Sequence, residues 1–381
     1  MPTVALRRAP SRRRYLAREI PPAYRPKPFS EMWTGELLIH GDNLEALRWL
    51  RHQPAVSQKV RLVYIDPPFG TRQLFTVTAQ RMATISRGHG GQLAYRDDVS
   101  GETYLRFLRG RFEAIRDLMV DGGAIYIHID CKVGHYVKCL LDEVFGPENF
   151  INDITRIKCN PKNFSRKGYG NVKDMVLFYK KSGGVVVWND VRQPVRLAMN
   201  DQRFRRAEHN GRRYTTTPLH APGETVNGET GRMWRGLRPP PGRHWRYSPS
   251  ALDELDRQGL VEWSSTGNPR KKMYADDAVR AGAKVQDVWM YKDPQNPRYP
   301  TEKNLEMLEF IVENSSRPGD IVLDAFCGSG TTLVAARALG RRWIGIDNSP
   351  VAVSTVKARL PDCVMHDLIA EARMASHGYV G

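Results

Sequence analysis

Two short apolar runs that each lead into an aspartate constrain the fold of this chain more than any other feature. Residues 62–65 read LVYI and are followed by the turn Asp66-Pro67-Pro68-Phe69, and residues 321–323 read IVL and are followed by Asp324. Apolar runs of this length are typical of strands buried in a parallel sheet. Because open α/β sheets bind their ligands at the carboxyl ends of the strands, both aspartates are predicted to lie at a binding edge.

The turn at 66–69 has the residue types that can activate an amino group on a nucleobase. Proline lacks an N–H and restricts the residue before it, so the turn is stiff. The Asp66 carboxylate and the Pro67 carbonyl can each accept a hydrogen bond from such an amino group and make its nitrogen more nucleophilic. Phe69 offers a flat face on which a base that has left the duplex can stack. The alternative is a proline-capped strand end without chemistry.

The second run leads into a loop that suits a nucleoside with a cationic amino-acid end. After Asp324, the candidate cofactor residues are Phe326, Cys327, Gly328, Ser329, Gly330 and Thr331. Glycines allow the backbone to approach a ligand closely. A pyrophosphate loop would have a third glycine where this chain has Leu333, and it would not be preceded by an acid. A later strand, 343–346, ends in Asp347-Asn348, and Asp347 is placed to accept hydrogen bonds from ribose hydroxyls.

In this order, the two motifs resemble those of DNA amino-methyltransferases that carry Asp-Pro-Pro-Tyr or Asp-Pro-Pro-Phe, in their permuted β group. In that group the catalytic motif comes first, a target-recognition region follows, and the cofactor loop comes last. The chain is similar to the modification subunits of type III restriction systems and their stand-alone relatives over about residues 33–360. The resemblance implies S-adenosylmethionine as the cofactor. Phe69 in place of the commoner tyrosine keeps the stacking face.

Two further segments carry this resemblance. Residues 41–47, GDNLEAL, are similar to the family's acidic cofactor segment, which implies that Asp42 and Asn43 contact the cofactor. Asp42 could instead only cap the helix that follows. Residues 299–303, YPTEK, are similar to the segment ahead of the glycine loop, which implies that Thr301 and Lys303 lie near the methionine end of the cofactor, together with Asp66. These two residues could instead only begin a helix.

The positive charge of the chain is concentrated in two stretches. The net charge is +17, residues 1–30 hold eight basic residues and one acid, and residues 191–246 hold twelve arginines and four acids. Localised positive charge of this kind favours contacts with DNA phosphates. We therefore expect double-stranded DNA as the partner. The DNA-binding candidates are Arg203, Arg205, Arg206, Arg212, Arg213, Arg235, Arg238, Arg270, Lys271 and Lys272.

Aromatic residues are interleaved with these arginines. Phe204, Tyr214, Trp234, Trp245 and Tyr247 lie among them in a stretch rich in glycine and proline. This pattern indicates a recognition module rather than sheet core. The alternative is a solvated basic face with the aromatic side chains packed beneath it.

The alternation of expected strands and helices predicts an α/β fold with a parallel sheet covered on both faces. The resemblance implies that this fold is the Rossmann-like one of class I methyltransferases, in circularly permuted motif order. We expect a basic arm at 1–30, a catalytic half at 31–184, a target-recognition region at 185–290 and a cofactor-binding half at 291–381. Residues 70–100 are expected to form a mobile loop over the site. Helices are expected at 43–51 and 133–144, and a long helix at 102–119.

The remaining features limit the function classes. No run of about 18 apolar residues occurs, so we expect no membrane span. The five cysteines show no metal spacing, which predicts no metal site and fits a reducing cytoplasm. Adenine N6 is the expected methyl acceptor, because the resemblance implies that Asp at the head of the motif is commonest in adenine enzymes. Cytosine N4 stays open, as do RNA or protein amide acceptors. The resemblance also implies a homodimer and a separate restriction endonuclease as candidate partners.

Overall fold

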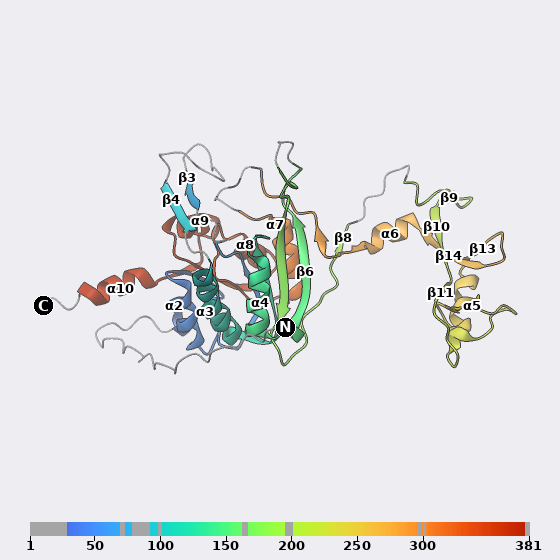
Figure 1. Cartoon of the computed structure of the whole chain (residues 1–381), viewed down its shortest axis with the longest axis horizontal. Coiled ribbons are helices and arrows are strands. Elements are labelled where there is room, and N and C mark those ends of the chain that lie inside the picture. Colours follow the sequence, from blue (N-terminus) through green and yellow to red (C-terminus); the bar gives the residue numbers. More distant parts are fainter. Residues whose placement is uncertain are drawn as a thin grey trace, which may run out of the picture. The chain divides into compact units, whose positions relative to one another are not determined.

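The structure is a computed structural model that describes residues 29–68, 73–77, 92–97, 101–161, 167–194, 201–295, 297, 299 and 302–377. The chain divides into two compact units. The sheet unit comprises residues 1–189 and 287–381, and the small unit comprises residues 190–286. Figure 1 shows the elements of both units. None of the helices within the described ranges has the length and apolar character needed to cross a membrane.

The described part of the sheet unit contains a nine-stranded sheet with a reversal in its strand order. Its strands, from one edge to the other, are β16 (Val288–Trp289), β6 (Phe150–Ile157), β7 (Lys173–Lys180), β5 (Met119–Ile129), β2 (Val60–Ile65), β17 (Ile321–Asp324), β18 (Arg342–Asp347), β1 (Glu36–His40) and β19 (Val364–Asp367). The chain runs from β17 to β18 in one direction and from β2 to β5 in the other. The boundary between β2 and β17 is therefore the switch point, where open sheets of this type bind ligands.

The sheet was expected to be parallel, and one of its strands departs from this. β7 pairs antiparallel with both β5 and β6, whereas the other pairs in this sheet are parallel. The reason is the connection between β6 and β7, since the described residues between these strands contain no crossover helix. Parallel neighbours need such a crossover, and without one β7 folds back between β5 and β6.

Helices cover both faces of the sheet (Figure 1). The helices of the sheet unit are α1 (Phe29–Met32), α2 (Asn43–Arg51), α3 (Glu102–Leu118), α4 (Gly134–Phe145), α7 (Leu305–Ser315), α8 (Thr331–Ala338), α9 (Pro350–Arg359) and α10 (Leu368–His377). Leu47, Leu108 and Leu141 of α2, α3 and α4 share one core with Ile39 and Val63 of the sheet. On the other face, Tyr126 of β5 bonds to Ser315 of α7 at 2.8 Å. The connections between parallel strands are right-handed, and they run toward opposite edges of the sheet in its two halves. Their helices therefore lie on opposite faces of the sheet.

The expected helices are confirmed within one or two residues, at α2, α3 and α4. The segment expected as a loop at 70–100 contains two antiparallel strands, β3 (Gln73–Val77) and β4 (Gln92–Asp97). The rest of that segment lies outside the described residues, as do residues 1–28 of the basic arm expected at 1–30, whose last two residues begin α1.

The small unit has its own sheets and its own core. Its elements are β8 (Arg192–Gln193), β9 (Arg206–Ala207), β10 (Arg213–Pro218), β11 (His220–Pro222), β12 (Arg243–Trp245), α5 (Pro249–Arg257), β13 (Val261–Trp263), β14 (Pro269–Tyr274), α6 (Ala275–Ala281) and β15 (Ala283–Lys284). Trp234 and Trp245 pack with Leu219 and Leu252 in its core. The view of these aromatic residues as recognition rather than core was therefore wrong for both tryptophans, because large rings supply the apolar surface a small unit needs.

Candidate active site

Four aspartates follow or end four adjacent strands of the sheet. Asp66 follows β2, Asp324 ends β17, Asp347 ends β18, and Asp42 follows β1 by two residues. β2 and β17 are parallel neighbours, with Leu62 opposite Val322 and Val63 opposite Leu323. The turn and the glycine loop, although far apart in the sequence, therefore lie at the same edge, at the switch point.

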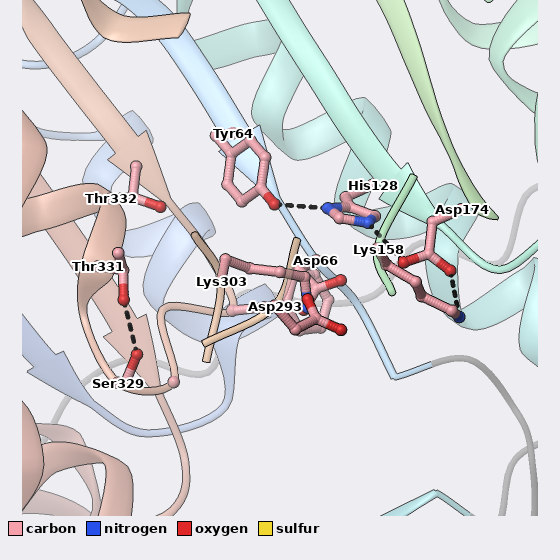
Figure 2. A network of polar contacts seen from close by, with 12 residues as sticks. Tyr64, Asp66, His128, Lys158, Asp174, Asp293, Lys303, Ser329, Thr331 and Thr332 are labelled. Carbon is pink, nitrogen blue, oxygen red and sulfur yellow. Dashed lines mark hydrogen bonds and ion pairs between the residues drawn. The ribbon is translucent and has the colours of Figure 1, made fainter. Parts of the chain in front are cut away.

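Asp66 is held through one of its two carboxylate oxygens. Lys303, just ahead of α7, forms an ion pair and hydrogen bond with Oδ2. Figure 2 shows the Lys303 side chain extending to Asp66. The other oxygen, Oδ1, is buried and has no hydrogen-bond partner within the described residues. A buried acceptor without a donor costs free energy, so Oδ1 is ready to accept a hydrogen bond from a ligand.

The neighbours of Asp66 in the predicted motif are only partly described. Pro67 is buried and Pro68 is half-buried, next to the end of β2. Phe69 and Thr301 lie outside the described residues. The proposed stacking and cofactor roles of these two residues stay predictions.

Asp324 is buried at the base of the glycine loop. Its Oδ1 accepts a hydrogen bond from the Phe326 backbone N–H at 3.1 Å, and its Oδ2 accepts one from the Thr332 hydroxyl at 2.6 Å. Burial, and more weakly the charges of Asp66 and Asp347, raise the pKa of Asp324 to about 7. A cationic group bound beside these acids would therefore stabilise the ionised form of Asp324.

Asp347 ties the second strand end to the same loop. Its carboxylate accepts hydrogen bonds from the Gly328 N–H and the Ser349 N–H, each at 2.9 Å. Gly328 has φ +49° and Gly330 has φ +73°, both in the left-handed region that favours glycine. At Gly330 a Cβ would lie 2.8 Å from Val356, so the loop has no room for a side chain there.

The remaining loop residues have structural contacts. Ser329 and Thr331 are buried and their hydroxyls are 2.9 Å apart. Burial raises the pKa of the Cys327 thiol well above its ordinary value, so this residue is a poor nucleophile. Asn348 is exposed. The five cysteines are free, and the described residues contain no cluster of side chains able to hold a metal ion.

Asp42 has the capping role that the sequence left open, and its neighbour reaches the loop. Asp42 Oδ1 accepts hydrogen bonds from the N–H groups of Leu44 and Glu45 and so caps α2. The Asn43 side-chain amide donates to the Ala325 carbonyl at 2.8 Å, directly after Asp324. Asn43 thereby joins α2 to the glycine loop.

Sequence reasoning missed Arg111, which fixes both of these residues. This arginine of α3 is buried, pairs with Asp42 Oδ2 at 2.9 Å and donates to Asn43 Oδ1. Its guanidinium also lies over the Phe107 ring, 3.5 Å from the centroid. The signal was an arginine three residues after Leu108 on the apolar face of a predicted helix, where a charge needs a partner.

A buried polar chain runs beside Asp66, starting from Tyr64 on the same strand. Tyr64 bonds to His128 Nδ1 at 2.8 Å, and His128 Nε2 bonds to Asp174 at 3.2 Å (Figure 2). Burial would raise the pKa of Asp174, but His128 and Lys158 outweigh it and hold that pKa well below its ordinary value. Burial lowers the pKa of His128. We therefore assign a neutral His128 that donates to Asp174 through Nε2 and accepts from Tyr64 through Nδ1.

Many predicted DNA-binding residues of the small unit are neutralised by acids. Their ion pairs are Arg203–Asp201, Arg206–Glu262, Arg212 with Asp276 and Asp277, Arg235 with Asp253 and Asp256, and Lys272–Glu208. Arg205 and Arg238 are exposed. Arg213 is half-buried, and Lys271 donates to the Tyr247 hydroxyl at 3.1 Å.

A second group of arginines in the small unit has hydrogen-bond partners without charge. Arg243 donates to His220 Nδ1 at 3.2 Å, Arg246 donates to the Pro218 carbonyl at 3.1 Å, and Arg270 donates to Thr216 at 2.8 Å. All of these partners are neutral oxygens or a ring nitrogen. Burial lowers the pKa of His220 most, and the positive charges of these three arginines lower it further. The three arginines therefore lie close together around His220. Within the described part of this unit, no carboxylate forms an ion pair with any of the three.

The sequence contained a signal for this cluster. Residues 230–252 hold five arginines and no acid. Arg243 and Arg246 were nevertheless left out of the predicted DNA-binding set, because the count of basic residues did not show where the acids would fold.

Comparison with known proteins agrees with this geometry. The sequence profile of a family described as DNA methylase, covering N6 and N4 enzymes, matches residues 60–358. The chain belongs to this family. Type II methyltransferase M.EcaI of Enterobacter cloacae is 40% identical over 327 residues, which cover 84% of this chain and 68% of that protein.

Other relatives share less. The type III restriction-modification enzyme StyLTI Mod subunit of Salmonella typhimurium is 24% identical over 335 residues, which cover 80% of this chain and 50% of that subunit. The chain thus spans about half the length of that subunit. The solved structure of an M1.HpyAVI–SAM complex aligns with a TM-score of 0.44 and 18% identity, over 85% of this chain and 99% of that one.

This methylase therefore has the α/β fold of class I S-adenosylmethionine-dependent methyltransferases and acts on DNA. S-Adenosylmethionine is its methyl donor. The residues at the sheet edge fit that ligand, because a buried carboxylate at position 324 and a half-buried one at position 347 suit its ammonium group and its ribose hydroxyls rather than a phosphate.

Proposed function

We propose that this methylase transfers a methyl group to the N6 amino group of an adenine that has flipped out of duplex DNA. The observation that carries the proposal is the buried, unpaired Oδ1 of Asp66, at the switch point and beside the glycine loop. An amino group supplies the donor that this oxygen lacks. The aspartate at the head of the motif and the type III Mod relatives favour adenine. Cytosine N4 is the alternative, because cytosine presents the same kind of amino group.

In the proposed reaction, the residues of the chain hold and orient the two substrates. Bound S-adenosylmethionine supplies the methyl group from a cationic sulfur, which keeps the electron pair of the broken bond. Asp66 Oδ1 accepts an N–H of the target amino group and stabilises the positive charge that develops as the new nitrogen–carbon bond forms. The same oxygen is placed to receive the proton that leaves the nitrogen. Alignment of the two reactants supplies much of the rate.

The cofactor is proposed to lie against the ends of β17, β18 and β1. Asp324 would hold the ammonium group of the cofactor, and Asp347 would hold its ribose hydroxyls. The backbone of the loop from Gly328 to Gly330 would approach the cofactor closely. Asn43 would support that loop through its bond to Ala325. Asp42 has both carboxylate oxygens engaged by α2 and Arg111, so its proposed contact with the cofactor would use its remaining lone pairs.

The small unit is proposed to be the target-recognition region. Arg243, Arg246 and Arg270 are the best supported phosphate contacts, because they lie together around His220 and no carboxylate forms an ion pair with them in the described structure. The ion-paired arginines are weaker candidates, since DNA would have to replace an acid that is already bound. We also propose that the protein forms a homodimer and works with a separate restriction endonuclease. Its proposed location is the cytoplasm, where the DNA substrate would be.

Nucleoside analysis tests the proposed reaction. Unmethylated genomic DNA is incubated with the protein and labelled S-adenosylmethionine, beside Asp66→Ala as the control, and is then digested to nucleosides. N6-Methyladenine that disappears with Asp66→Ala is the expected result. N4-Methylcytosine would keep the mechanism and change the base. Absence of label in either base, with DNA and cofactor bound, would refute the proposal and direct the search to RNA or protein amides.

A further inference from the structure

The two oxygens of the Asp66 carboxylate have different surroundings. Oδ2 is paired with the Lys303 ammonium, and the side chains of Lys303 and Asp66 are only 10% and 16% exposed. Oδ1 is buried without a partner among the described residues. The terminal torsion of an aspartate is broad and nearly two-fold, so a free carboxylate would exchange these oxygens readily. The ion pair distinguishes them.

Lys303 itself stands on a fixed part of the backbone. The next residue, Asn304, caps α7, with its Oδ1 accepting from the Met307 N–H at 3.0 Å. Its amide also donates to the Lys292 carbonyl at 3.0 Å. The lysine is therefore anchored directly beside a helix end, and its ammonium reaches the carboxylate that follows β2 (Figure 2).

The strand that leads to Asp66 is held by a second set of contacts. Tyr64 lies two residues earlier, on the same face of β2, and its hydroxyl belongs to the buried chain through His128 and Asp174. Asp66 thus follows a strand end fixed by that chain, and its side chain is fixed by Lys303. Both restraints act before any base is bound.

We propose that Lys303 is a positioning residue for Asp66, which holds Oδ2 so that Oδ1 faces the amino group of the target base. This inference rests on the proposed function, in which Asp66 accepts a hydrogen bond from the base. It differs from the role implied by the family resemblance, in which Lys303 contacts the methionine end of the cofactor. The two roles predict different kinetics, because orientation of the base amino group acts in the methyl-transfer step and cofactor binding acts on KM.

The experiment compares Lys303→Met with Lys303→Arg in steady-state methylation of unmethylated genomic DNA. Methionine keeps the length and removes the charge, whereas arginine keeps the charge. Lys303→Met is expected to lower kcat at least about tenfold while KM for S-adenosylmethionine changes less than about threefold. Lys303→Arg is expected to recover part of the lost kcat. Thermal unfolding and cofactor binding of each variant are measured in parallel to show that the fold is intact.

Lys138→Met is the matched control. Lys138 forms an ion pair with Asp142 on α4 in the same unit, at 2.8 Å, so the control removes an equal charge and an equal kind of contact. Its kcat is expected to stay at the wild-type value. A raised KM for S-adenosylmethionine with unchanged kcat in Lys303→Met would overturn the inference in favour of cofactor binding, as would failure of Lys303→Arg to recover any activity while it remains folded. Lack of methylation by the wild type would instead refute the proposed function itself.

Discussion

Replacing Arg243 and Arg246 together by alanine is expected to weaken DNA binding and to reduce its dependence on salt. Both side chains are exposed, and their hydrogen bonds go to His220 and to the Pro218 carbonyl rather than to a carboxylate. Each guanidinium is therefore free to replace the counterions of a phosphate. Arg270 is left in place, because its two bonds to Thr216 also join β10 to β14.

The magnitude follows from the number of unneutralised charges. Each phosphate contact contributes about 0.9 to the slope of log K against log salt concentration, so the double variant should lower that slope by about 1.8. At a salt concentration of about 0.15 M, counterion release is worth about 1 kcal/mol per contact. The two substitutions should therefore cost about 2 kcal/mol, or roughly 30-fold in Kd.

The assay is fluorescence anisotropy with an end-labelled duplex, titrated at several salt concentrations. The recognition sequence is not needed, because this electrostatic contribution does not depend on sequence. The matched control is the double variant Arg257→Ala and Arg280→Ala. These arginines lie in the same unit but form ion pairs with Glu254 and with Asp276 and Asp277. The control should change the slope by less than about 0.5.

Two results would refute this reasoning. A slope for the Arg243 and Arg246 variant equal to that of the wild type would show that these arginines do not contact phosphates. An equal fall in slope for the control would show that net charge, rather than the pattern of ion pairs, determines DNA binding.

Three further predictions concern the sheet edge. In the proposed site Asp324 holds the cofactor's ammonium group, and burial raises the pKa of Asp324 to about 7. Protonation of Asp324 below that pH should therefore lower the affinity for S-adenosylmethionine by up to about tenfold per pH unit. Calorimetry should show this dependence in the wild type and its loss in Asp324→Asn. Arg111→Met removes the donor to Asn43 and to Asp42, so it should lower the free energy of unfolding by about 2 kcal/mol and raise KM for the cofactor. An unchanged urea midpoint would contradict this. Cys327→Ala should keep kcat within about threefold, because the buried thiol forms no covalent intermediate; complete inactivation of a folded variant would contradict it.

Local sequence patterns predicted the elements that position the site. The apolar face of 102–119 gave α3 within one residue, and Asp42 caps α2 as its position before the helix allows. The Asp-Pro-Pro turn and the glycine loop both follow strands at the expected edge. These features depend mainly on residues a few positions apart, so they can be read from the chain itself.

Contacts between distant residues could not be read in this way. The sequence did not show that Lys303 pairs with Asp66, that Arg111 holds Asn43, or that β7 runs antiparallel. It also marked Arg206 as a DNA-binding candidate and left out Arg243, although Arg206 has an acid beside it and Arg243 donates to a histidine. A charge count adds residues without regard to which ones meet after folding.

The sequence by itself therefore determined the family, the methyl donor and the two loops that meet at the site. Only the tertiary structure decided which oxygen of Asp66 lacks a hydrogen-bond partner among the described residues and which arginines form ion pairs with acids. The physical reason is that a hydrogen bond or ion pair depends on distances of a few ångströms between groups, and those distances are set by packing of the whole unit rather than by neighbouring residues.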